Sequence, residues 1–225
     1  MKRLLLVALA MLAATHLEAQ VGVPPERSPF RDIENRMDVS LVSGAFIGGG
    51  DPVGVAPKSG TYVGARYEFS MGLIGATGRL GLAPTKRAIL DPTAPEGSRI
   101  TGEVNSSLVL LDAGFTIGLT GRRTFHNLAP YFGVGLGFAT DLELADAHGY
   151  DLGPRFMFTL GAGMKWLFGS TWQVRLDATD HIFRVSYPSS YFLSDPGEMP
   201  VRIGDESVST HNLIVTVGLS YRFFR

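Results

Sequence analysis

The chain has 225 residues, no cysteine and a formal net charge of −1. It can therefore form neither a disulfide framework nor a thiolate metal site, and its charge gives no reason to expect nucleic-acid binding. With 28 glycines, 45% hydrophobic residues and only 18% charged residues, the composition favours a β protein rich in turns. No linker interrupts the chain, so a single folded domain is expected.

Residues 1–19 have the pattern of a signal peptide. Lys2 and Arg3 precede an apolar run from Leu4 to Ala14, and a usable cleavage site ends at Ala19. The run is much shorter than the roughly 20 residues of a membrane-spanning helix, so export is predicted rather than anchoring. Residues 20–35 are rich in proline and have no apolar period, which predicts a disordered lead-in on the periplasmic side.

The rest of the chain alternates apolar and polar residues. In the clearest segment, Val109, Leu111 and Phe115 share one parity, and Asp112 and Thr116 share the other. Successive side chains of a strand point to opposite faces, so each such segment predicts a strand with one apolar face. The expected strands are 37–47, 63–69, 74–82, 109–119, 132–138, 156–166, 172–182 and 212–223.

The connections between these segments alternate in length. Long ones are expected at 50–60, 84–105, 141–153 and 187–209, and short ones lie between them. A barrel with short periplasmic turns and long outer loops has this arrangement, and each segment can supply the ~9–11 residues that cross a bilayer at a tilt. The four long connections are therefore expected outside the cell.

The apolar parity carries almost no charge, with Asp180 as the exception near the loop end of its strand. The other parity stays polar along the chain. A small soluble barrel would place its apolar side chains inside, whereas a transmembrane barrel places them toward lipid. Residues 36–225 are thus predicted to form an all-β, eight-stranded, antiparallel up-and-down transmembrane barrel.

A family resemblance rests on the last strand. Gly218, Leu219, Tyr221 and Phe223 resemble the C-terminal signal of bacterial outer-membrane barrels that the barrel-assembly machinery recognises, although Phe224 and Arg225 extend past it. The span 37–223 resembles the eight-stranded barrels of the outer-membrane protein A, X and W group. This resemblance implies a location in the bacterial outer membrane, with membrane lipid and the assembly machinery as partners and no cofactor.

Charged residues on the inward parity are the main polar feature. Their signs nearly balance, and burying an ion is costly unless it is paired, so they predict a plug of paired charges in the lumen. A structural or surface-interaction role follows, with a narrow channel for small or apolar solutes as the alternative. The predicted network is Asp38, Arg66, Glu68, Arg79, Asp112, Lys165, Arg175, Asp177 and Arg222.

A third hypothesis is an enzyme that modifies lipid. Ser209 and His211 are same-face neighbours, but the sequence places no acid beside them, so a non-catalytic histidine is favoured. His181 near Asp177 and Asp180 invites the same hypothesis, and no enzymatic role is expected for either histidine.

The remaining polar motifs favour no ligand. Asp141, Glu143 and Asp146 lack EF-hand spacing and are expected to be solvated. The glycines 133, 135 and 137 have strand period rather than the spacing of a nucleotide-binding loop. A possible extracellular partner is assigned to the last long loop, through Tyr187, Tyr191 and Phe192.

Overall fold

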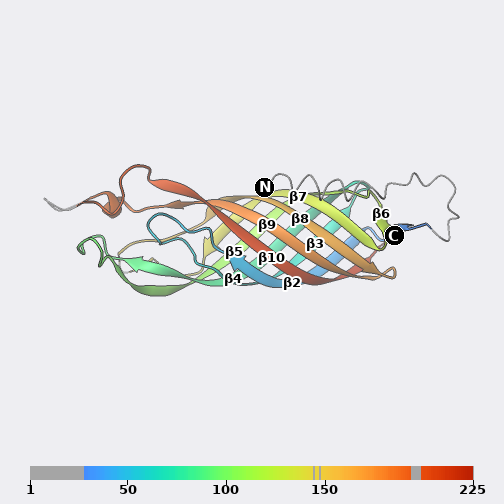
Figure 1. Cartoon of the computed structure of the whole chain (residues 1–225), viewed down its shortest axis with the longest axis horizontal. Coiled ribbons are helices and arrows are strands. Elements are labelled where there is room, and N and C mark those ends of the chain that lie inside the picture. The colour runs from blue at the N-terminus through green and yellow to red at the C-terminus, as the bar shows by residue number, and fades with distance from the viewer. Residues whose placement is uncertain (1–27, 144, 147, 194–198, 225) are drawn as a thin grey trace, which may run out of the picture.

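The computed structural model describes residues 28–143, 145–146, 148–193 and 199–224; the expected signal peptide and residues 20–27 lie outside the described residues. Long antiparallel strands form a tilted barrel (Figure 1). They are β2 (Met37–Ile47), β3 (Gly60–Ser70), β4 (Ile74–Leu90), β5 (Ile100–Gly118), β7 (Leu128–Asp141), β8 (Arg155–Phe168), β9 (Trp172–Ser186) and β10 (Ser207–Phe223).

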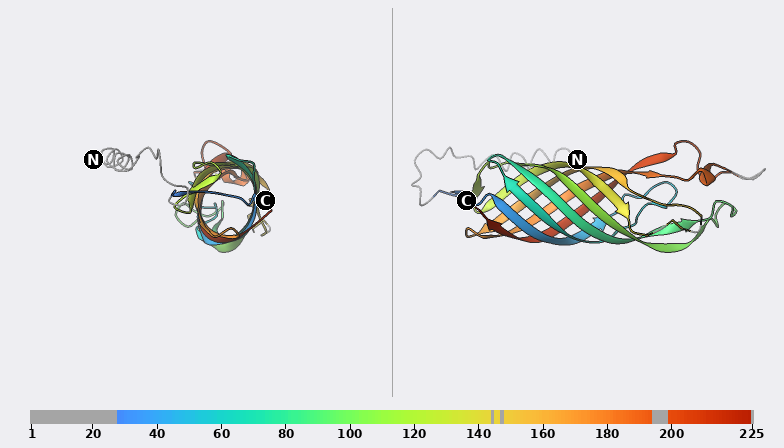
Figure 2. Two further views of the ribbon diagram at one scale, coloured as in Figure 1. Left: turned by 90° about the vertical axis from the view of Figure 1, so that its right-hand side faces the viewer. Right: turned by 180° about the vertical axis from the view of Figure 1, so that it is seen from behind.

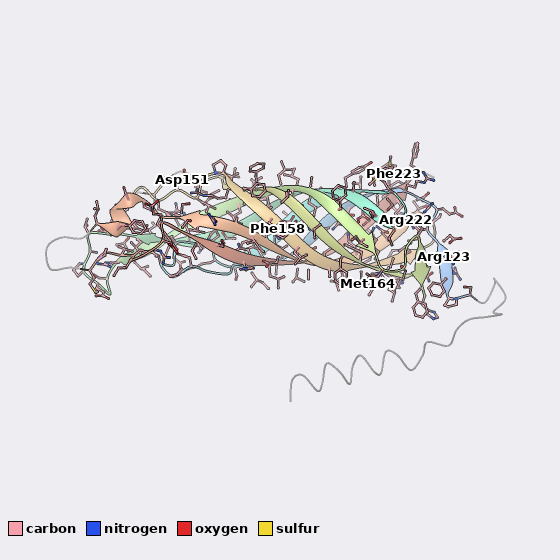
Figure 3. The ribbon with its side chains drawn as sticks, turned by 90° about the horizontal axis from the view of Figure 1, so that it is seen from above. Arg123, Asp151, Phe158, Met164, Arg222 and Phe223 are labelled. Atoms are coloured by element: carbon pink, nitrogen blue, oxygen red, sulfur yellow. The ribbon has the colours of Figure 1, made fainter. Side chains whose placement is uncertain are left out.

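The ring closes between its first and last strands. β10 pairs with β2 from Leu213 opposite Ile47 to Phe223 opposite Met37, and every other long strand pairs with its neighbours in the chain. This register confirms the predicted eight-stranded barrel. We call the end with residues 48–59, 91–99, 142–154 and 187–206 the loop end, and the opposite end the turn end. Asp151 lies at the loop end and Arg123 at the turn end (Figure 3).

The β4–β5 hairpin is longer than predicted. Most of the expected loop 84–105 is strand, since β4 continues to Leu90 and β5 begins at Ile100. The pairing is interrupted only by an irregularity between Ile89 and Leu90. The hairpin projects beyond the apolar belt, where a strand needs no lipid-facing side chains and can carry polar residues.

The outer wall carries a belt of exposed apolar side chains around the barrel. Leu80, Leu111, Leu136, Leu160 and Leu176 are each more than half exposed. Exposed aromatic residues occupy the turn end of the belt, where Trp172 and Tyr221 pack edge to face with ring centroids 5.2 Å apart. This arrangement matches an interfacial aromatic girdle. Among the described residues, no helix is long and apolar enough to span a membrane.

Residues 28–36 form what we call the strap, which crosses the turn end of the barrel (Figure 2, left). Within it, β1 (Phe30–Asp32) pairs with β6 (Arg123–Phe125), which lies in the connection between β5 and β7. The Asn35 side chain donates to the Ser170 carbonyl at 2.6 Å, and the Ser70 amide donates to the Arg36 carbonyl at 2.6 Å. The prediction of disorder is therefore wrong for residues 28–35. Backbone hydrogen bonds hold this segment, and such bonds require no periodic apolar residues that could be recognised in the sequence.

The barrel interior has two zones. Toward the turn end it is polar, as predicted, but toward the loop end the inward positions are apolar, so the prediction of a polar face throughout is wrong. Inward side chains from the strands there join loop residues in one buried cluster. Its larger members are Phe46, Val55, Tyr62, Leu108, Leu110, Tyr150, Leu152, Met157, Phe183, Val185, Tyr187, Tyr191 and Ile214. The loops bury this cluster against each other and close the loop end.

Candidate functional site: a charge network across the lumen

Arg175 lies at the centre of the polar zone. Its side chain is fully buried, and its guanidinium contacts Asp38 at 3.2 Å, Glu68 at 3.2 Å and Asp177 at 3.1 Å. These carboxylates come from β2, β3 and β9, so one side chain of β9 links strands that lie beyond its neighbour β10 in the ring. Ser40 accepts a further hydrogen bond from Arg175 at 3.1 Å. The planar guanidinium suits such multiple contacts because its donors diverge from one centre.

Two further cations complete this group. Arg66 contacts Glu68 at 3.0 Å and Asp177 at 3.2 Å, and Lys165 donates to Glu68. Three positive and three negative side chains, the latter including Asp38, therefore alternate in a buried cluster. Each charge has an opposite charge within hydrogen-bond range, which offsets the desolvation that burial imposes.

Tyr131 is a central member of the network that the sequence prediction missed. Its hydroxyl accepts from Arg175 at 2.7 Å and donates to Asp177. Its ring lies 5.3 Å from the Arg66 guanidinium, 5.3 Å from the Lys165 ammonium and 5.5 Å from the Arg175 guanidinium. Its position in the sequence could have revealed it. Tyr131 directly precedes the apolar stripe that begins at Phe132, so it points into the lumen when the stripe points to lipid.

A second group lies nearer the loop end. The Arg79 Nε donates to Asp112 at 2.8 Å, and its terminal nitrogens donate to Thr179 at 3.1 Å and Thr159 at 3.0 Å. The buried His181 lies 4.0 Å from Asp112 and contacts the Thr179 carbonyl at 3.2 Å. His181 is therefore a lumen residue within a hydrogen-bonded group, and its side chain points away from Asp180, which faces the outer wall.

Arg222 is placed differently from the other predicted network residues. It lies at the turn end and donates to the Asn35 carbonyl at 3.4 Å (Figure 3). Arg222 thus holds the strap to the barrel mouth.

Two inward glycines make room for tyrosine rings. A Cβ at Gly163 would lie 2.5 Å from the Tyr131 ring, and a Cβ at Gly81 would lie 2.1 Å from the Tyr62 hydroxyl. Gly218 lies beside an arginine instead, since a Cβ there would lie 3.3 Å from the Arg175 side chain. Each tyrosine occupies the space of a missing side chain on a neighbouring strand.

Little empty space remains within the lumen. Two cavities among the charged residues measure about 10 and about 20 Å³, and a third of about 50 Å³ lies beneath the strap at the turn end. A cavity needs about 10–15 Å³ to hold one water molecule. Each of the two inner cavities therefore has room for about one water molecule.

The loop end holds a separate buried cation, Arg87. Its guanidinium contacts Asp146 at 2.7 Å and Asp141 at 3.8 Å, and it lies 4.9 Å from the centre of the Tyr150 ring. Both carboxylates are almost fully buried, so the prediction that they are solvated is wrong. Arg87 belongs to the long β4–β5 hairpin, which the sequence prediction treated as a loop.

The aromatic residues of the last loop also pack inward. Tyr187 donates to Asp51 at 2.9 Å and stacks on Tyr191, with ring centroids 6.2 Å apart. Burial, and then the nearby Asp51 carboxylate, raise the pKa of Tyr187 above its ordinary value. Tyr187 and Tyr191 are buried and Phe192 packs against the same cluster, so these residues do not present the partner surface that was expected.

Removing Arg87 is expected to loosen this loop packing. The Arg87→Ala variant leaves Asp141 and Asp146 buried without their cation, a change that typically costs about 3–5 kcal/mol. Limited proteolysis should then cleave within 142–154 in the variant but not in the native chain. The Lys86→Ala variant changes the exposed neighbour on the same strand and should leave cleavage unchanged. Equal cleavage of both variants would contradict the role given to Arg87.

The outer wall contains one pair that the sequence prediction did not find. His211 Nδ1 lies 2.7 Å from Asp180 Oδ2, so an acid does lie beside the Ser209–His211 pair. The two residues are 31 positions apart and meet through the β9–β10 register. Over the described part of the chain, no cluster of three or more His, Cys, Asp or Glu residues could hold a metal ion.

Comparisons with known proteins agree with this architecture. The chain resembles the outer membrane protein OprG from Pseudomonas aeruginosa, with 12% identity, a TM-score of 0.54, and 85% of this chain and 98% of that chain covered. The Neisserial surface protein A gives 12% identity and a TM-score of 0.46, covering 87% of this chain and 98% of that one. Outer membrane protein W from E. coli gives 15% identity and a TM-score of 0.45, with 84% of this chain and 99% of that chain covered.

A search of curated protein sequences found no match. A family model, described as the outer membrane protein beta-barrel domain, matches residues 4–223. That match spans nearly the whole chain and agrees with the closed ring, the apolar belt and the polar lumen. The chain therefore belongs to the outer membrane protein beta-barrel domain family and is a protein of the bacterial outer membrane.

Proposed function

We propose that this protein is a structural or surface-interaction barrel whose lumen is plugged. The observation that carries the proposal is the fully buried Arg175, which contacts carboxylates on β2, β3 and β9. Eight strands enclose a space that side chains can just fill. A solute moving through the lumen would have to separate several buried ion pairs, and each separation leaves charges unpaired.

Both ends of the barrel support the same proposal. The buried apolar cluster covers the lumen at the loop end, and the strap crosses its turn end. A narrow channel for small or apolar solutes would need both ends to open. The plug is therefore favoured over the channel.

The orientation and partners are also part of the proposal. The loop end faces outside the cell, and the belt contacts outer-membrane lipid. Gly218, Leu219, Tyr221 and Phe223, at the end of β10, are the segment for the barrel-assembly machinery. Any extracellular partner would contact the outer faces of the loops, since Tyr187 and Tyr191 are buried. No cofactor and no nucleic acid are assigned.

Electrical recording tests the plug. The refolded native chain, inserted into a planar lipid bilayer, is expected to give no steady conductance. Heat-modifiable gel mobility should show that the same sample is folded. A reproducible conductance of the native chain that changes in Arg175→Ala or Asp177→Ala, but not in the exposed Arg123→Ala variant, would overturn the plug in favour of the channel.

A further inference from the structure

A polar cluster lies on the outer wall of β9 and β10, apart from the lumen network. In β10 the residues at even positions, such as Thr210 and Asn212, are buried, and Ser209 and His211 face outward. The register places Ser209 opposite Arg184, His211 opposite Ile182 and Leu213 opposite Asp180. Along the wall, His211 therefore lies between the positions of Asp180 and Ser209.

The contact between Asp180 and His211 sets the state of the imidazole. A carboxylate only accepts hydrogen bonds, so the His211 Nδ1–H donates to Asp180 Oδ2 across 2.7 Å. The His211 Nε2 is then left with its lone pair. The other carboxylate oxygen, Asp180 Oδ1, is buried and has no hydrogen-bond partner among the described residues. The contact with Asp180 therefore fixes the tautomer and the orientation of the His211 ring.

The cluster lies where the wall changes from apolar to polar. Leu160 and Leu213, the register neighbours of Asp180, are exposed members of the apolar belt. Nearer the loop end, the outward positions of the same two strands are polar, since Arg184 and Ser209 are exposed there. An acid on the lipid-facing wall is costly, and ionisable groups at such depth commonly mark function. The ester groups of membrane lipids lie at this same boundary between hydrocarbon and headgroups.

We propose that Ser209, His211 and Asp180 form a site that hydrolyses carboxylic esters of outer-membrane lipids. Same-face neighbours on one strand are about 6.7 Å apart. An imidazole between them can hold Asp180 with Nδ1 and approach the Ser209 hydroxyl with Nε2. This order of nucleophile, base and acid is the one that activates a serine. The assignment is independent of whether the lumen is plugged.

The reaction balances with water as the only co-reactant. Ser209 Oγ attacks the ester carbonyl carbon and its proton passes to His211 Nε2. The C–O bond to the lipid alcohol then breaks, and His211 returns the proton to the leaving oxygen, which leaves an acyl-serine. Water attacks that ester in the same way, releases the fatty acid and restores the serine. Asp180 is a positioning residue, and the exposed Arg184 lies where it can bind a headgroup phosphate.

Covalent labelling and lipid hydrolysis together test the site. The folded protein in detergent is treated with a fluorophosphonate probe, and the modified peptide is located by mass spectrometry. Fatty-acid release is measured separately with phosphatidylethanolamine liposomes and with liposomes containing lipopolysaccharide. We expect labelling at Ser209 and release from at least one lipid. Ser209→Ala should reduce release to the protein-free rate, and His211→Gln should reduce it at least about a hundredfold.

Matched variants separate chemistry from folding. Ser207→Ala removes a hydroxyl from the same strand, and His126→Gln removes an exposed histidine from the turn end, so both should keep full release. Asp180→Asn should lower release and change its pH profile, because the Nδ1 partner is no longer an anion. Gel mobility should show every variant folded. The proposal would be overturned if no adduct formed at Ser209. It would also be overturned if neither lipid released fatty acid in a way that required Ser209.

Discussion

Replacing Arg175 with alanine is expected to destabilise the folded barrel by about 3–5 kcal/mol, the usual range when one partner of a buried ion pair is removed. The variant leaves Asp38, Glu68 and Asp177 facing each other without their shared cation. It also removes the donor to the Tyr131 hydroxyl. The free energy of unfolding, measured by urea titration in liposomes or detergent, should show the loss as a lower midpoint.

The matched control uses a solvent-exposed ion pair at the turn end. Arg123 lies 3.0 Å from Asp32, and the two side chains are 63% and 76% exposed. Exposed pairs typically contribute less than about 1 kcal/mol, so Arg123→Ala should change the midpoint little. If Arg175→Ala lowered stability no more than Arg123→Ala does, the lumen network would not be a determinant of stability.

The second large effect is expected on the lipid-facing wall. Leu111 is 54% exposed in the middle of the apolar belt, so Leu111→Arg would place a guanidinium in hydrocarbon. Such a substitution costs about 2–4 kcal/mol near the bilayer midplane and only about 0–1 kcal/mol near the interfaces. The variant should unfold at lower urea concentration than the native chain when both are refolded into liposomes.

Leu119 provides the comparison for depth. It is 56% exposed, like Leu111, but it follows the last residue of β5 at the turn end. Leu119→Arg should therefore reduce the free energy of unfolding much less than Leu111→Arg does. Equal losses for the two variants would mean that the belt does not lie in the hydrocarbon region.

The parts of the fold that depend on the alternation of apolar and polar residues within one strand could be predicted from the sequence. Alternation in segments such as 109–119 gave the strand positions, the number of strands and the faces toward lipid and lumen. The inward charges followed from the same alternation. Arg175 and Asp177 flank Leu176 in the sequence, so they point into the lumen when Leu176 points to lipid. Parity says which way a side chain points, and it needs no knowledge of long-range pairing.

The features that were missed depend on contacts between distant segments. Asp180 meets His211 because of the β9–β10 register, and Tyr131 joins the network because Gly163 lies beside it on β8. The strap is held by pairing with β6, where three residues are too short to show a period. The loop-end packing around Arg87 was hidden because polar residues on a strand beyond the membrane look like a loop.

The sealed lumen is the central claim, and cysteine accessibility tests it most directly, because the native chain has no cysteine. Single cysteines are introduced at Thr159 in the lumen, at Ser98 at the loop end and at Ser170 at the turn end. A membrane-impermeant thiol reagent added to intact cells should label only the cysteine at position 98. After the outer membrane is permeabilised, it should also label position 170, while position 159 should stay unmodified until the protein is unfolded. Labelling of position 159 in the folded protein, at a rate like that of position 98 or 170, would contradict a plugged barrel.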